Sequence, residues 1–109
     1  MSEHKIFRKL FLGFISIHIL HHAAKEPFYG AWMMEELKRH GYSMSPGTLY
    51  PLLHGLEKDG LISSVEMNIE GKMRKYYSAT ESGKTALLAT RGKVYELFRE
   101  IKSEAGEES

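Results

Sequence analysis

The sequence contains no cysteine among its 109 residues, which excludes disulfide bridges, zinc–thiolate sites and cysteine nucleophiles. Long apolar runs are also missing. The longest nearly unbroken one, LFLGFISIHIL, has 11 residues, whereas a membrane-spanning helix needs about 20. The opening MSEHKIFRKL lacks the basic, apolar and small-residue succession of a signal peptide. We therefore expect a cytoplasmic protein without a membrane partner.

A strong charge of either sign is absent as well. The chain has 15 lysines and arginines against 14 acids, a formal net charge of +1. Three of those acids fall in the last seven residues, so the rest of the chain is mildly basic. The proportions of hydrophobic (42%) and charged (27%) residues are typical of one globular domain. We predict one compact unit: a main body over residues 1–80, a helix over 81–103 and a disordered tail over 104–109.

Apolar residues crowd the first predicted helix, which runs from about Lys5 to Ala24. They recur at spacings of three and four but also spread around much of the helix circumference. One small domain covers only one stripe of such a helix, so the surplus predicts a second chain packed against it. The alternative is the central core helix of a monomer.

A second helix is predicted within YGAWMMEELKRHG, residues 29–41. Tyr29, Met33 and Leu37 form its apolar stripe, and Gly41 marks its end. Trp32 lies about 100° from Met33 around this helix. We expect Trp32 either to pack at a domain junction or to stack on a ligand.

The stretch SPGTLYPLLHGLEKDG, residues 45–60, predicts a third helix despite its prolines and glycines. Ser45 suits the N-cap, and Pro46 suits the first helical position because its missing N–H would have no intrahelical partner there. Gly60 marks the end of the helix. The residues expected to face the core are Leu49, Leu52, Leu53 and Leu56.

The opposite face of this third helix consists mostly of small residues. Pro51 presses against the carbonyl of residue 47, where a glycine eases the backbone adjustment. Such a face allows close approach to a surface, which suits a helix in a DNA groove, although a tolerated irregularity on a solvated face is the alternative. The residues expected to contact DNA are Thr48, Tyr50, His54 and, at a phosphate, Lys58.

A β-hairpin is predicted next, with strands at residues 61–68 and 73–78 and a turn at Gly71. Its tip and returning strand carry Lys72, Arg74 and Lys75, which we expect to face the same side as His54. Alone, these bases would indicate a solvated sheet edge. The order of helix, turn, leucine-striped helix and basic hairpin predicts a mainly α winged helix-turn-helix, in which the third helix enters the major groove.

The last predicted helix begins after Thr80, its N-cap, and runs to about Ser103. Its near-heptad seam consists of Leu87, Val94, Phe98 and Ile101. Gly92 within the helix costs about 1 kcal/mol relative to alanine, so the helix needs packing to persist. Packing against the first helix of a second copy predicts a homodimer with two recognition helices.

The stretches FYGAWMMEELKRHGYSMSPGTLYPLLHGLEKDGLISS and EGKMRKYYSATESGKTAL resemble the PadR family of bacterial transcriptional regulators. The resemblance covers about residues 13–88. It implies a dimeric winged-helix repressor of the short subfamily, with a single C-terminal helix, that binds a pseudo-palindromic operator in double-stranded DNA. It places the DNA-reading helix at residues 45–59, which includes Ser45, and the wing at residues 68–74.

The same resemblance implies either a constitutive repressor or one that a small aromatic or cationic effector releases from DNA. Such a compound would enter a cavity near the dimer axis, although its lining residues could equally be plain core. That candidate lining consists of Phe7, Phe11, Phe14, Tyr95 and Phe98. Some relatives carry a drug-stacking tryptophan in the last helix; this sequence has none there, so we do not expect that mode of binding.

Three histidines in HILHH depart from the family pattern. His18, His21 and His22 are spaced so that two or three imidazoles can share a helix face and bind a divalent metal, or make dimer stability depend on pH. Neither a cysteine nor an obvious carboxylate accompanies them, and we expect no metal or other cofactor.

Two other functional classes remain as alternatives. An enzyme is not expected, because no nucleophile elbow, phosphate loop, metalloprotease pair or Rossmann fingerprint occurs in the sequence. A winged helix used only for protein contact would have no need of a basic hairpin.

Overall fold

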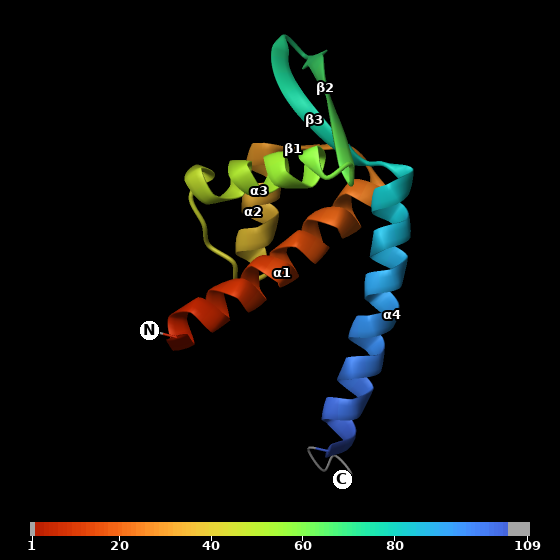
Figure 1. The fold of residues 1–109 in the computed structure, drawn as a ribbon. Helices are drawn as coiled ribbons and strands as arrows, with labels where there is room; N and C mark the ends of the chain where they lie inside the picture. The colour runs from red at the N-terminus through yellow and green to blue at the C-terminus, as the bar shows by residue number, and fades with distance from the viewer. Residues whose placement is uncertain (1, 105–109) are drawn as a thin grey trace.

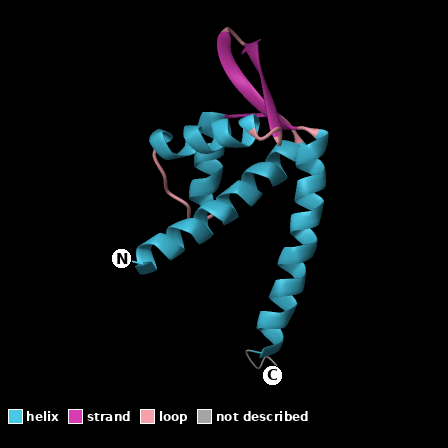
Figure 2. Ribbon diagram, in the orientation of Figure 1, coloured by secondary structure: helices cyan, strands magenta, loops and turns pink. Residues whose placement is uncertain are grey.

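The computed structural model describes the backbone of residues 2–104 and the side chains of residues 5–104. The fold is mainly helical with a small antiparallel sheet, as predicted (Figures 1 and 2). The elements are α1 (Ser2–Lys25), β1 (Phe28–Tyr29), α2 (Gly30–Arg39), α3 (Pro46–Lys58), β2 (Ile62–Ile69), β3 (Lys72–Ala79) and α4 (Glu81–Glu104). Of the tail predicted over 104–109, Glu104 closes α4 and residues 105–109 lie outside the described part.

The β2–β3 hairpin projects from the helical body (Figure 1). Its strands pair without interruption from Ile62 opposite Ala79 to Ile69 opposite Lys72. The connecting residues, Glu70 and Gly71, have φ angles of 52° and 81°. Two consecutive positive φ angles are those of the two-residue turn that matches the twist of a hairpin. The predicted turn at Gly71 is confirmed.

The sheet has a third strand that the sequence did not predict. The strand order is β1-β3-β2, with Phe28 opposite Tyr77 and Tyr29 opposite Tyr76. The assignment of Tyr29 to the apolar stripe of α2 was therefore wrong. Tyr29 has an extended backbone and is the N-cap residue of α2. Two paired residues are too few to produce an alternating pattern in the sequence.

The hydrophobic core lies where α1, α2, α3 and the base of the sheet meet. Its fully buried side chains are Ile19, Met33, Leu37, Leu49, Leu53 and Ile62. Leu52 and Leu56 are partly buried against them, so the predicted leucine stripe of α3 is confirmed. Because this stripe holds one face of α3 against the core, the opposite face of the helix is turned outward.

Thr80 caps α4, as predicted, and also ties the helix to the preceding segment. Its Oγ1 accepts a hydrogen bond from the Gly83 N–H (3.0 Å) and donates one to the Gly60 carbonyl (2.6 Å). The Thr80 N–H donates to the Leu61 carbonyl (3.0 Å). These bonds join the start of α4 to the segment that follows α3.

Large apolar side chains remain exposed on the first half of α1 and along α4. The two helices contact each other, and Figure 1 shows them diverging from the junction beside the sheet. The exposed residues are Ile6, Phe7, Leu10, Phe11 and Phe14 on α1 and Leu88, Val94, Tyr95, Leu97, Phe98 and Ile101 on α4. Within residues 2–104, no helix is long and apolar enough to cross a membrane.

Candidate nucleic-acid interface

The outward face of α3 is exposed along its length, and Gly47 leaves its first turn without a side chain. Gly47, Pro51, His54 and Lys58 are exposed, and Thr48 is partly buried beside them. A Cβ atom added at Gly47 would meet only the Ser45 hydroxyl among the described residues, at an ordinary contact distance of 3.5 Å. A flat partner can therefore approach the backbone of this helix closely.

Ser45 occupies the predicted N-cap position, with an extended backbone and Pro46 following it. Among the described residues, its side chain makes no capping hydrogen bond. The Ser45 residue is exposed, so its hydroxyl is available to hydrogen-bond to a partner at the N-terminal end of α3.

Tyr50 is half exposed, with 43% of its surface accessible. Its ring lies against Gly30 at the start of α2, where an added Cβ would overlap the phenol. Tyr50 and Gly30 line a hollow of about 320 Å³ together with Arg74 and Lys75. Two bases therefore lie beside the N-terminus of α2, which favours negative charge.

The three bases of the hairpin do not face one side, contrary to the prediction. β3 is an uninterrupted strand, so its side chains alternate between the two faces of the sheet. Lys72 and Arg74 share one face, and Lys75 lies on the other. The Arg74 guanidinium lies 4.0 Å from the centre of the Tyr29 ring, a cation–π contact that holds the side chain.

Lys75 lies on the face that packs against α3. It shares that face with Tyr77, whose cross-strand partner Ser64 donates a hydrogen bond to Glu57 Oε2 of α3 (2.7 Å). Of the three bases, Lys75 is therefore the one directed toward the side of α3.

The family model for the transcriptional regulator PadR-like family matches residues 19–89. The chain belongs to the PadR-like family. It is 51% identical over 87 residues to Transcriptional regulator Rv3488 of Mycobacterium tuberculosis, a match that covers 80% of this chain and 81% of that protein. The protein is thus a PadR-like transcriptional regulator, and its relatives carry the names of regulators rather than of enzymes.

Solved structures of the PadR-like family share the fold. A PadR-like transcriptional regulator from Bacillus cereus superposes with a TM-score of 0.83 at 26% identity, covering 89% of this chain and 96% of that one. A PadR family regulator from Eggerthella lenta gives 0.73 at 28% identity, with 96% of each chain covered. The predicted winged helix-turn-helix fold is confirmed.

The five aromatic residues predicted to line an effector cavity do not come together in a single cavity within this chain. Phe7 and Phe11 stack on each other (6.2 Å between ring centres) and line a hollow of about 600 Å³. Phe14 lines a different hollow, of about 330 Å³, between α1 and α4. Tyr95 and Phe98 lie farther along α4 and are 64% and 58% exposed.

The histidines are arranged differently from the predicted set. His18 and His22, one helical turn apart, face α2, and His40 after α2 joins them. His21 lies outside this set and lines the hollow between α1 and α4, which His18 lines as well. The expected absence of a carboxylate was wrong too, because Glu36 contacts both His22 and His40. The spacing of His18 and His22 was visible in the sequence, but their partners come from another helix.

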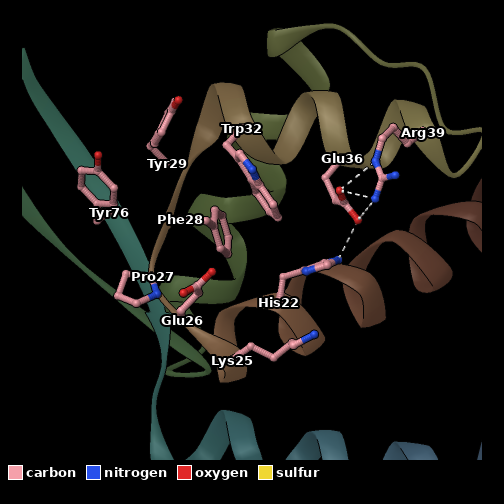
Figure 3. Close-up of a pocket in the computed structure, with 10 residues that line it drawn as sticks. All are labelled: His22, Lys25, Glu26, Pro27, Phe28, Tyr29, Trp32, Glu36, Arg39 and Tyr76. Carbon is pink, nitrogen blue, oxygen red and sulfur yellow. Dashed lines mark hydrogen bonds and ion pairs between the residues drawn. The ribbon is translucent and has the colours of Figure 1, made fainter.

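Trp32 packs at the junction of α1, β1 and α2, one of its two predicted roles. Its ring lies edge-on to His22 (5.4 Å) and 6.3 Å from Phe28. Figure 3 shows these side chains around a hollow of about 420 Å³, with Glu36 and Arg39 at one end. Trp32 is 40% exposed and stands at the rim of this hollow.

Proposed function

We propose that this PadR-like regulator is a homodimeric repressor that binds a pseudo-palindromic DNA operator. The observation that carries the proposal is the outward face of α3, where exposed small residues leave the helix backbone open. Thr48, Tyr50 and His54 border this backbone and supply hydrogen-bonding groups for base edges. Pro51 adds bulk without a donor, so it fills space rather than reading a base.

The charges around α3 support contact with the DNA backbone. Lys58 lies at the end of α3, and Arg74 and Lys75 line the hollow beside the N-terminus of α2. A phosphate in that hollow would meet two positive side chains, the Tyr50 hydroxyl and the positive end of a helix dipole. Lys72, at the hairpin turn, would reach a phosphate farther along the duplex.

The apolar side chains left exposed on α1 and α4 support the dimer. In this proposal residues 1–80 form the DNA-binding body and α4 supplies the dimerisation helix. A two-fold axis beside α1 and α4 would present two α3 helices to half-sites one DNA turn apart, about 34 to 36 Å. A dimer bound over a promoter excludes polymerase from that DNA.

A small aromatic or cationic effector would bind at this dimer interface. Phe7, Phe11, Phe14, Tyr95 and Phe98 come from two divergent helices, so only a second chain can enclose them in one cavity. A compound bound there would change the angle between protomers and hence the spacing of the two α3 helices. Operator affinity would fall because the two helices would no longer match both half-sites.

The test is the salt dependence of binding to the DNA upstream of the protein's own gene, measured by fluorescence anisotropy. The slope of log K against log salt is negative, and each lost phosphate contact makes it shallower by about 0.9. For the double variant Arg74→Ala/Lys75→Ala we expect a slope shallower by about 2 and weaker binding at every salt concentration.

The matched control is Lys84→Ala/Lys93→Ala, which removes two charges from α4 without touching α3 or the hairpin. This variant should keep the wild-type slope. Equal slopes for the two double variants would contradict the proposed contact between the hairpin and the DNA backbone.

A further inference from the structure

Four metal-ligating side chains converge between α1 and α2, outside the proposed DNA interface. His18 and His22 extend from α1, Glu36 from α2, and His40 follows the end of α2. Ligand nitrogens of the three histidines all lie within 4.8 Å of one another. Glu36 Oε2 lies 3.0 Å from His40 Nε2 and 3.3 Å from His22 Nε2.

We propose that these four side chains form a binding site for one divalent transition-metal ion of the zinc class. Bonds of about 2.0 to 2.2 Å in a tetrahedral site place neighbouring ligand atoms about 3.3 to 3.6 Å apart. The two distances from Glu36 Oε2 already approach this edge length. Closing around an ion would bring the three imidazole nitrogens, which lie within 4.8 Å of one another, to this edge length.

The donor set identifies the class of ion. Three imidazoles and one carboxylate, with no thiolate in the chain, suit Zn²⁺, Co²⁺ or Ni²⁺ rather than the oxygen-seeking Mg²⁺ and Ca²⁺. Burial lowers the pKa of His18 and of His22, and the neighbouring imidazoles lower the pKa of His18 further. These lowered pKa values favour the neutral imidazoles of His18 and His22, whose lone pairs a metal needs.

The carboxylate is oriented by an outer partner. Arg39 Nε and Nη2 donate to Glu36 Oε1 at 3.1 and 3.0 Å, and Oε2 points toward the imidazoles (Figure 3 shows His22, Glu36 and Arg39). Burial opposes ionisation of Glu36, but the hydrogen bonds from Arg39 and His40 outweigh it and hold its pKa below the usual value. Glu36 is therefore a charged ligand whose carboxylate is oriented by Arg39. Ligands in many metal sites are oriented by such a second hydrogen-bond partner.

The site joins two parts of the fold. His18 and His22 belong to α1, and Glu36 and His40 belong to the first helix of the helix-turn-helix pair and its end. Without a metal, the carboxylate and imidazoles are held by hydrogen bonds that require protons on the rings. With a metal, one ion replaces those protons and clamps α2 to α1.

The test uses the full chain without an affinity tag, stripped of metal. Zn²⁺ is titrated against a chromophoric chelator, and Co²⁺ is added separately to read the visible absorption of a four-coordinate site. We expect one ion per chain. His22→Gln and His40→Gln should each weaken Zn²⁺ binding by about 100-fold or more. Loss of a residue that only hydrogen-bonds to a ligand costs about 10- to 100-fold in metal affinity, and loss of a ligand itself should cost at least as much.

The matched control is His21→Gln, since His21 neighbours His22 but lies outside the cluster. It should keep the wild-type affinity and the Co²⁺ spectrum. An equal loss in His21→Gln, or wild-type binding no tighter than that of His22→Gln/His40→Gln, would overturn the site and leave the cluster as a hydrogen-bonded contact only.

A thermal melt separates loss of the site from loss of the fold. Zn²⁺ at a free concentration 100 times its Kd should raise the wild-type Tm by about 10 °C, because the metal binds only the folded chain. In His22→Gln/His40→Gln the same addition should leave Tm unchanged, whatever the stability of that variant without metal. A similar rise in the double variant would overturn the proposal.

Discussion

Replacing Gly47 by glutamate should abolish specific DNA binding, with affinity falling by at least about 100-fold, while the protein remains at least as stable. Gly47 lies in the first turn of α3, on its outward face. An added Cβ meets only the Ser45 hydroxyl at 3.5 Å among the described residues. An acid in the first turn favours the helix dipole, and glycine is a poor helix former. On DNA, however, the carboxylate would occupy the close contact and face the phosphates.

The measurement is anisotropy with operator DNA beside urea unfolding of the same samples. Gly92→Glu is the matched control, because it makes the same change at an open position of α4. Gly92→Glu should bind DNA as the wild type does. If Gly47→Glu bound equally well, α3 would not lie against DNA with this face.

Replacing Gly83 by alanine should destabilise the fold by about 2 to 3 kcal/mol, as other overpacked sites do, and lower Tm by about 10 °C or more. Gly83 is buried in the first turn of α4, where an added Cβ would fall on the Leu61 carbonyl oxygen. That oxygen cannot move aside freely, because it accepts the Thr80 N–H at 3.0 Å.

Calorimetry of Gly83→Ala and Gly92→Ala checks this expectation. Gly92 has no described neighbour within 4 Å of an added Cβ, and its replacement should stabilise α4 by up to about 1 kcal/mol. Similar Tm values for the two variants would show that α4 does not pack closely on the segment after α3.

Features set by neighbouring residues could be predicted from the sequence. The leucine spacing of α3 identified Leu49 and Leu53 as core, and Thr80 and Gly71 identified a helix start and a hairpin turn. Each depends on a helical period, a cap or a turn within a few residues of chain. The outward face of α3 followed from the same geometry.

Features set by contacts between distant segments could not be predicted in this way. His40 and Glu36 meet His22 only because α2 packs across α1. No residue near HILHH in the sequence indicates that these two side chains are its neighbours. β1 is stabilised by pairing with β3, which lies more than 40 residues later. The face of the sheet on which Lys75 lies could be predicted only from the exact bounds and register of β3. A register shift of one residue moves every side chain of the strand to the opposite face.

The most direct test of the proposed function is selection of DNA by the purified, folded protein from a random-sequence library. We expect the enriched sequences to share two inverted half-sites whose centres lie about 10 base pairs, or a multiple of that spacing, apart. Gly47→Glu should enrich nothing under the same conditions. Failure of the wild-type protein to enrich any sequence, or enrichment of a single half-site without symmetry, would contradict a dimeric repressor that reads DNA through α3.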